Sequence, residues 1–220
     1  MDIVTEQNLK FKHPFTCMVA GPTGCGKTFF VRRLLSEHRL LITGDKKVLK
    51  VVWCYGIWQK TYLKSIENVN VQYIDRLPSE EELKKMQVDL IVFDDMMQSL
   101  KDSSSLGNIF TRGSHHLGLS VIFIVQNLFN QGREMRNISL NSQYIIIMKN
   151  IRDKSQIMNF AKQYAPGETK SFLEVYNDAI NECHGYLKID LRTDTPVEFR
   201  LTTNIFPNEN REVNPTIYVL

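Results

Sequence analysis

The hydrophobic positions of this chain form short apolar runs that alternate with helical patterns. The runs expected to form strands are residues 15–20, 48–55, 69–74, 90–93, 121–125 and 144–148. Several of these runs are nearly all apolar, which is typical of strands that helices cover on both faces. Strands that alternate with helices predict an α/β fold built from βαβ units, with helices flanking a mainly parallel central sheet.

Helical patterns lie between the apolar runs. Residues 27–41 predict a helix that begins directly after a glycine-rich segment, and Ser79 with Glu82 forms a capping box that starts a short helix. Apolar side chains recur at helical spacing within residues 169–183, which predicts one more amphipathic helix. These are Phe172, Val175, Tyr176, Ala179, Ile180 and Cys183. Phe123, Phe129 and Tyr144 have apolar neighbours and are expected in the core.

The C-terminal region changes to a strand-like alternation. Residues 185–206 contain GYLKIDLR and VEFRLTTNIF, joined by residues 193–196. This pattern predicts an antiparallel hairpin at the edge of the sheet. No repeat, linker or low-complexity segment divides the sequence, so we expect a single domain over residues 1–220, with residues 1–12 as an N-terminal extension.

Composition and charge fit an ordinary soluble domain. Of 220 residues, 43% are hydrophobic and 23% are charged, and the formal net charge of +3 is too small to indicate a nucleic-acid partner by itself. The four cysteines are scattered, so neither a disulfide framework nor a zinc site is predicted. The first residues are polar and no apolar run reaches about 18 residues. We therefore expect an intracellular protein with no membrane span.

A glycine-rich segment between an expected strand and an expected helix matches the phosphate-loop pattern GxxxxGK[ST]. Its residues are Gly21, Pro22, Thr23, Gly24, Cys25, Gly26, Lys27 and Thr28. Glycines let the backbone turn its N–H groups toward phosphate oxygens, and the helix N-terminus adds a partial positive charge. We expect this loop to bind ATP, with Lys27 on the β and γ phosphates and Thr28 as a Mg²⁺ ligand.

Two further strand ends place polar side chains beside this loop. The apolar run 88–93 ends on Asp94 and Asp95, where a Walker B element is expected. Asp94 is predicted to hold Mg²⁺, and Asp95 to orient or deprotonate the attacking water. Many ring ATPases have glutamate at the second position, and aspartate is one methylene shorter. Gln126 follows the run 121–125, and its amide is predicted to sense the γ phosphate if this strand lies between the Walker A and Walker B strands.

The chain resembles a known family in four segments, which are GPTGCGKT, VFDDM, FTRGSHHLGLSVIFIVQNLFNQG and NSQYIIIMKNIRDKSQI. Together they are similar to FtsK/HerA-type DNA-packaging ATPases, closest to those of Polinton-like and adintovirus-like elements. The packaging ATPases of large eukaryotic DNA viruses look like more distant relatives. The resemblance covers roughly residues 10–165. It implies a homo-oligomeric ring that uses ATP to move double-stranded viral DNA into a preformed capsid, at its portal vertex or another capsid site.

Members of that family complete each site with an arginine from a neighbouring subunit. Such a group is worth about 10³ to 10⁵ in rate. Arg112 is the first candidate because it lies between Asp95 and Gln126 in sequence, and Arg136 and Arg152 are alternatives. Basic residues outnumber acidic ones in segments 27–50 and 131–162, so a ring could line its pore with positive charge. The resemblance also implies work at a viral assembly site inside the host, in the nucleus or the cytoplasm.

Other functions fit the phosphate loop alone. One is a small P-loop kinase acting on nucleosides or nucleotides, although no cluster of lid arginines is present and the Gln126 strand has no purpose in a kinase. Another is a virion assembly protein that uses nucleotide as a switch, which the combination of Lys27, Asp94 and Asp95 disfavours. The adjacent His115 and His116, and Cys183 with His184, lack the spacing of metal ligands.

Overall fold

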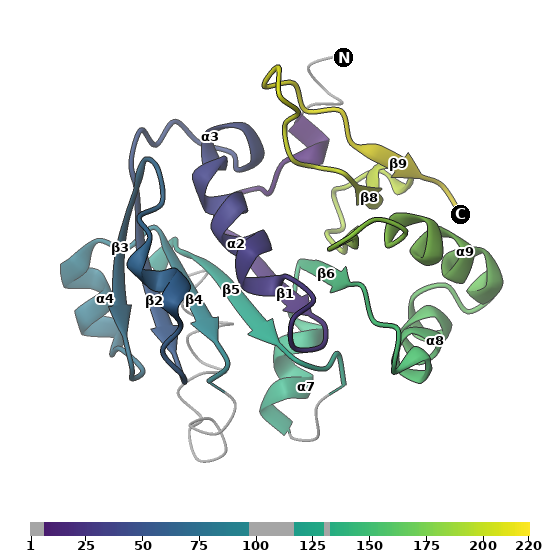
Figure 1. Cartoon of the computed structure of the whole chain (residues 1–220), viewed down its shortest axis with the longest axis horizontal. Coiled ribbons are helices and arrows are strands. Elements are labelled where there is room, and N and C mark those ends of the chain that lie inside the picture. The colour runs from purple at the N-terminus through teal and green to yellow at the C-terminus, as the bar shows by residue number, and fades with distance from the viewer. Residues whose placement is uncertain (1–6, 97–116, 130–132) are drawn as a thin grey trace.

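The structure is a computed structural model that describes residues 7–96, 117–129 and 133–220. These residues form one nine-stranded sheet in the order β3-β2-β4-β5-β1-β6-β7-β8-β9 (Figure 1). The strands are β1 (Thr16–Ala20), β2 (Leu49–Tyr55), β3 (Val69–Ile74), β4 (Leu90–Asp94), β5 (Ser120–Val125), β6 (Tyr144–Met148), β7 (Tyr186–Asp190), β8 (Leu201–Thr203) and β9 (Thr216–Tyr218).

The sheet has a parallel part and an antiparallel part. Strands β3, β2, β4, β5, β1 and β6 pair in parallel, whereas β7, β8 and β9 continue the sheet in antiparallel pairs. Strand β5 lies between β1 and β4, so the strand before Gln126 separates the phosphate-loop strand from the acidic strand. The mainly parallel sheet and the position of this additional strand are therefore confirmed.

Helices cover both faces of the parallel strands. They are α2 (Lys27–Ser36), α3 (His38–Leu41), α4 (Glu80–Met86), α7 (Arg133–Leu140), α8 (Lys154–Tyr164) and α9 (Thr169–Ala179), with short 3₁₀ helices η1 (Lys60–Leu63) and η3 (Val197–Phe199). On one face, Cys17 and Val19 of β1 share a core with Phe30 of α2. On the other, Met18 shares a core with Phe172 of α9. This two-sided burial is the physical reason why the strands are apolar at nearly every position.

The predicted helices differ from the observed ones at their ends. The expected helix 27–41 is two helices, because the backbone turns at Glu37 (φ −97°, ψ 20°) before α3 begins. The expected helix 169–183 ends at Ala179. The capping box of α4 is confirmed, since Ser79 and Glu82 exchange both of its hydrogen bonds. Helices α7 and α8 were not predicted. Phe129 is 38% exposed, so its expected place in the core is wrong.

The predicted C-terminal hairpin exists, but it does not form the edge of the sheet. Lys188 of β7 pairs with Thr202 of β8 in antiparallel register. Strand β9 then pairs with β8 and becomes the outermost strand. Part of the expected second strand is the 3₁₀ helix η3. The three residues of β9 are too few to give a period-two signal, which is why the sequence did not indicate this strand.

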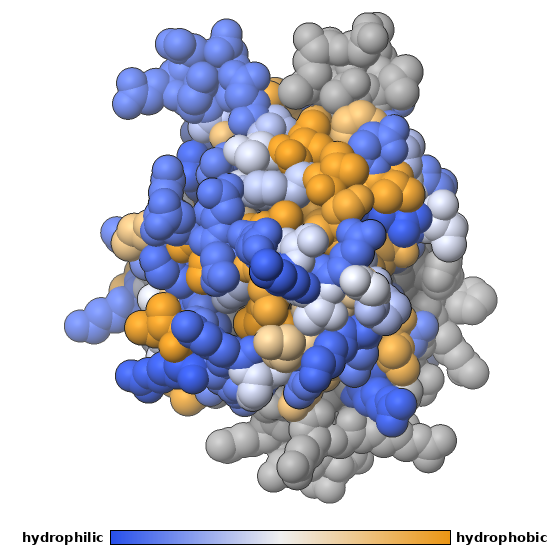
Figure 2. Space-filling view, turned by 90° about the vertical axis from the view of Figure 1, so that its right-hand side faces the viewer, coloured by the Kyte–Doolittle hydropathy of each residue, from blue (hydrophilic) through white to orange (hydrophobic). Residues whose placement is uncertain are grey.

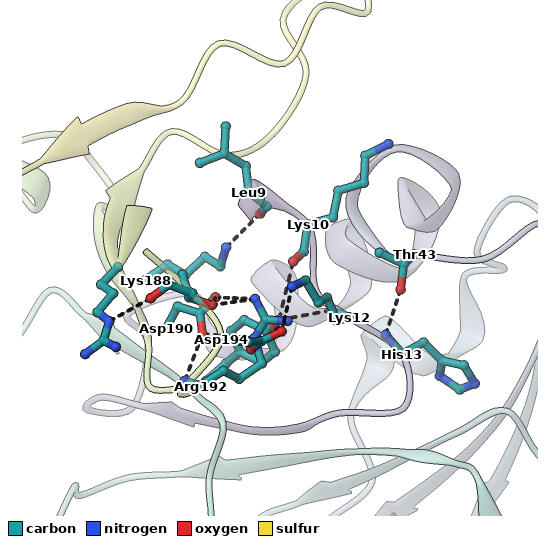
Figure 3. Close-up of polar contacts among 12 residues, drawn as sticks. Leu9, Lys10, Lys12, His13, Thr43, Lys188, Asp190, Arg192 and Asp194 are labelled. Carbon is teal, nitrogen blue, oxygen red and sulfur yellow. Dashed lines mark hydrogen bonds and ion pairs between the residues drawn. The ribbon is translucent and has the colours of Figure 1, made fainter. Parts of the chain in front are cut away.

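Buried charges in the antiparallel part hold the N-terminal segment (Figure 3). Lys188 is fully buried on β7, and its Nζ donates a hydrogen bond to the Leu9 carbonyl at 2.7 Å. The same ammonium lies over the rings of Phe11 and Tyr144, 4.9 and 5.5 Å from their centroids. The N-terminal segment, predicted as an extension, is therefore packed onto the sheet from Leu9 onward.

The surface of this part of the molecule is mixed in character. Hydrophobic atoms gather in the upper half of the face viewed in Figure 2, next to a polar projection. The exposed large hydrophobic residues of the C-terminal region are Val197 and Val219, each 64% exposed.

Within the described ranges, none of the helices combines the length and apolar character that a membrane crossing needs.

Candidate nucleotide-binding site

The phosphate loop lies between the end of β1 and the start of α2, as the sequence predicted. Gly24 and Gly26 have positive φ angles of 82° and 101°, a region that other residues enter only with strain. Gly26 is also the N-cap of α2. At the other end of the loop, a Cβ on Gly21 would lie 2.7 Å from Cβ of Met148, so only glycine permits this approach to β6. Strand, loop and helix therefore form the anion-binding arrangement expected at a helix N-terminus.

Lys27 turns its ammonium group back over the loop. Its Nζ donates hydrogen bonds to the carbonyls of Gly21 at 2.6 Å and Pro22 at 2.9 Å. Burial lowers the pKa of Lys27, while the nearby Cys25, Asp94 and Asp95 raise it. A partly desolvated cation in this position is suited to an anionic ligand, because a phosphate would supply the countercharge that the loop carbonyls supply only in part.

Asp94 ends β4 and is almost completely buried, with 3% of its surface exposed. One of its carboxylate oxygens, Oδ2, accepts hydrogen bonds from the hydroxyls of Thr28 at 3.2 Å and Tyr62 at 2.8 Å. Burial raises the pKa of Asp94, and these two hydrogen bonds act in the opposite direction. Burial also raises the pKa of Tyr62, so the phenol keeps the proton that it donates. No sequence pattern pointed to Tyr62, because a contact between η1 and β4 is not visible in a local pattern.

The oxygen atoms at this point fit a magnesium ion. Mg²⁺ prefers oxygen ligands and often binds through one or two protein groups together with substrate phosphates. Thr28 and Asp94 supply a hydroxyl and a carboxylate that already contact each other beside the phosphate loop. In the described part of the chain, histidine, cysteine and acidic residues form no cluster of three that could hold a metal ion.

Asp95 and Gln126 contact each other across neighbouring strand ends. Gln126 Nε2 donates a hydrogen bond to Asp95 Oδ1 at 3.3 Å. Asp95 has a left-handed backbone, with φ 54°, which turns the chain sharply after β4. Gly56, which follows β2, permits this turn, because a Cβ there would lie 2.3 Å from the Asp95 carbonyl oxygen. The sequence predicted both side chains in the site, but neither their contact nor the part played by Gly56.

Two pockets flank the phosphate loop. The first, with a volume of about 360 Å³, brings together five of the predicted loop residues and the predicted residues of both strand ends. It is lined by Thr23, Gly24, Gly26, Lys27, Thr28, Phe29, Gln59, Asp94, Asp95, Ile124, Val125 and Gln126. The second, of about 740 Å³, lies on the β6 side of the loop. Its lining includes Lys149, Ile151, Arg152, Cys183 and His184.

The candidate arginines have different positions. Arg112 lies outside the described residues, as do His115 and His116. Arg136 is exposed on α7, and Arg152 lines the second pocket beside its own phosphate loop.

His184 also contacts the phosphate loop. Its Nδ1 lies 3.1 Å from the Cys25 carbonyl oxygen, and a Cβ on Gly26 would meet the His184 ring at 2.9 Å. No sequence pattern indicated this contact, because the residues are far apart in the chain.

The chain matches a protein-family model over most of its length. The family model described as Poxvirus A32 protein matches residues 4–162, a range that includes every predicted site residue. A comparison with curated protein sequences found no match. The expected closeness to Polinton-like and adintovirus-like elements stays a prediction.

Solved structures share the fold at low sequence identity. The genome packaging NTPase B204 from Sulfolobus turreted icosahedral virus 2, in complex with ATP-gammaS, matches with a TM-score of 0.54 and 13% identity, covering 81% of this chain and 93% of that chain. The DNA-packaging ATPase B204 from Sulfolobus turreted icosahedral virus matches with a TM-score of 0.54 and 11% identity, covering 81% and 93%. These likenesses establish the P-loop ATPase fold.

Proposed function

We propose that this chain, which belongs to the Poxvirus A32 protein family, is a Mg²⁺-dependent ATPase that moves double-stranded viral DNA into a preformed capsid. The observation that carries the proposal is the convergence of Lys27, Asp94 and Gln126 in one pocket beside the phosphate loop. The shared fold of B204, whose name describes a DNA-packaging ATPase, supports the choice of motor over other P-loop enzymes.

Phosphate binding follows from the loop and its lysine. Backbone N–H groups of residues 23–28 and the N-terminus of α2 bind the phosphates, and Lys27 exchanges the loop carbonyls for β and γ phosphate oxygens. Thr28 and Asp94, whose side chains already share a hydrogen bond, would hold Mg²⁺. When bound, the ion offsets the charge that develops on the transferred phosphoryl group.

Asp95 and Gln126, which contact each other, activate the attacking water. The Asp95 carboxylate accepts a hydrogen bond from the attacking water and takes its proton, and the Gln126 amide fixes that carboxylate and senses the γ phosphate. The left-handed turn at Asp95 brings the shorter side chain to the rim of the same pocket as Lys27. This turn provides a reason why aspartate can act where many ring ATPases use glutamate.

The nucleoside would occupy the second pocket. The γ phosphate must lie toward Asp94 and Asp95, so the rest of the nucleotide leaves the loop on the opposite side, along β6. There Ile151 offers an apolar surface and is 72% exposed, while His184 and Arg152 offer flat groups able to stack on a base. Replacing Ile151 with aspartate should raise the KM for ATP more than it lowers kcat.

Translocation needs a ring of identical subunits and contact with DNA phosphates. In this arrangement Arg112 would reach the neighbouring site, with Arg136 and Arg152 as alternatives. Several basic residues of segment 27–50 already have partners within the chain, including Arg32 with Tyr73, Arg39 with the Lys47 carbonyl and Lys46 with Asp89. In segment 131–162, Arg152 and Lys154 are exposed and add positive charge that a pore could use. Its contacts should weaken steeply with added salt, because bound phosphates release counterions.

The test is ATP hydrolysis by the purified protein with and without long duplex DNA, measured beside its size in solution. A ring-sized species stimulated by DNA, with hydrolysis lost in Lys27→Ala, supports the proposal. Arg112→Ala should then reduce hydrolysis in the assembled ring by about 10³-fold or more. A monomer whose ATP hydrolysis does not respond to DNA and which phosphorylates added nucleosides would identify a kinase. Nucleotide binding without turnover would identify a virion component switched by nucleotide.

A further inference from the structure

The connection between β2 and β3 reaches Asp94, the proposed metal ligand, through the side chain of Tyr62. Tyr62, on the 3₁₀ helix η1, donates its hydroxyl proton to Asp94 Oδ2 at 2.8 Å. Both groups are buried, with 4% of Tyr62 and 3% of Asp94 exposed. The same oxygen accepts the proton of Thr28. Two hydroxyls from separate elements therefore meet at one carboxylate oxygen.

An aromatic cluster fixes the Tyr62 ring. Its ring stacks on Tyr73 with centroids 4.9 Å apart and an interplanar angle of 25°. Trp53 and Trp58, the two tryptophans of the chain, lie with their ring centroids 5.6 and 5.4 Å from that of Tyr62. Arg32 of α2 donates a hydrogen bond to the Tyr73 hydroxyl at 2.9 Å. The ring therefore has little freedom to leave Asp94.

The rest of the connection is more open to solvent. Ile57, Trp58 and Leu63 are 68%, 48% and 76% exposed. Gln59 precedes η1, accepts a hydrogen bond from the Tyr62 backbone N–H at 3.0 Å and lines the first pocket. This short turn thus reaches the site through Gln59 and Tyr62, while Ile57 and Leu63 are exposed to solvent.

We propose that Tyr62 is a positioning residue for the magnesium site, holding Asp94 in the orientation that receives the ion and linking the site to the β2–β3 connection. This role rests on the ATPase function proposed above. A hydrogen bond to a charged group fixes the direction of the carboxylate, and a buried carboxylate that has to reorient binds a cation more weakly. Nothing in the phosphate-loop motif itself supplies this donor.

The experiment compares Tyr62→Phe with Tyr73→Phe. Both variants remove one phenolic hydroxyl from the same stacked pair, but only Tyr62→Phe loses the contact with Asp94. Metal binding is read by the electron paramagnetic resonance signal of Mn²⁺ in the presence of a non-hydrolysable ATP analogue. Tryptophan fluorescence during a Mg²⁺ titration gives a second reading, because both tryptophans contact Tyr62.

For Tyr62→Phe we expect the metal concentration at half-saturation to rise about tenfold. The affinity for nucleotide in the presence of a metal chelator should stay unchanged. Excess Mg²⁺ should restore much of kcat, and Tyr73→Phe should bind metal as the wild type does. If both variants match the wild type, the role of Tyr62 is overturned while the ATPase proposal stands. If the wild-type protein shows no metal-dependent nucleotide binding or hydrolysis, the proposed function itself fails. A thermal melt of each variant separates either result from misfolding.

Discussion

The two parts of the sheet each bury an aspartate at a strand end, and the partners of these aspartates differ. In the parallel part, the Asp94 carboxylate accepts hydrogen bonds from the neutral hydroxyls of Thr28 and Tyr62, has the Lys27 ammonium nearby and lines a pocket. Asp190 in the antiparallel part is completely buried and accepts two hydrogen bonds from the Arg192 guanidinium, at 3.1 and 2.8 Å. A buried carboxylate with a full countercharge stabilises the fold, whereas one with neutral donors beside a pocket is suited to an external cation.

The strongest test of this comparison makes the same change at both positions. Asp94→Asn keeps an acceptor oxygen, so we expect little loss of stability but a fall in ATP hydrolysis of about 10²-fold or more. Asp190→Asn leaves the buried Arg192 cation with a 3.9 Å ion pair to the exposed Asp194 in place of its close countercharge, so the free energy of unfolding should fall by about 3–5 kcal/mol. Urea unfolding and ATPase assays on both variants check this. A reversed pattern would show that the partners do not determine the two roles.

A second prediction uses pH to examine the antiparallel part alone. Burial lowers the pKa of Lys188 from 10.5 to about 8, with Asp190 and Cys17 raising it and Arg192 lowering it further. Between these pH values the unfolded chain binds a proton that the folded chain does not, so stability contributed by this group rises with pH. We therefore expect the free energy of unfolding of the wild type, relative to that of Lys188→Met, to increase by about 3 kcal/mol as the pH rises across this window.

The measurement is urea unfolding of both proteins at a series of pH values from 7 to about 10.5. The difference between the two curves cancels groups that titrate in both proteins, such as the tyrosines. A difference that stays flat with pH would mean that Lys188 keeps the pKa of a solvated lysine. ATP hydrolysis at pH 7 should be similar in the two proteins, because Lys188 lies outside both pockets of the site.

A third prediction returns to the parallel part and concerns Gly56. A methyl group there would meet the Asp95 carbonyl oxygen at 2.3 Å, so Gly56→Ala must displace the turn that holds Asp95. We expect a cost of about 1–3 kcal/mol in stability and a lower kcat, with KM for ATP changed less. Gly167→Ala is the matched control, because no atom lies within 4 Å of its added methyl group. Equal kinetics in the two variants would contradict the role of Gly56.

The smallest expected effect lies in α4, away from both aspartates. Ser79→Ala removes one half of the capping box with Glu82 and should cost about 1 kcal/mol of unfolding free energy. Ser79→Asp, which keeps an acceptor at the N-cap, should recover most of this loss. ATP hydrolysis should be the same in all three proteins, and a change in kcat would mean that α4 is coupled to the site.

Sequence reasoning predicted the parallel part better than the antiparallel part. Most of the parallel strands are apolar runs with sharp ends, and residues at the ends of two of them belong to the site, so strand prediction also located Asp94 and Gln126. The antiparallel part is built from short strands and buried charges, such as Lys188 and Asp190, which break a simple hydrophobic pattern. The break in the first helix at Glu37 was missed because no glycine or proline marks it.

The sequence by itself determined the phosphate loop, the acidic strand end and the α/β class, because glycine conformations, strand periodicity and helix starts are local properties of the chain. Only the tertiary structure decided that Tyr62 donates to Asp94, that Gly56 makes room for Asp95, that His184 contacts the loop and that Lys188 holds the N-terminal segment. Each of these contacts joins residues far apart in sequence. The register and order of the strands set them, and no local pattern encodes that geometry.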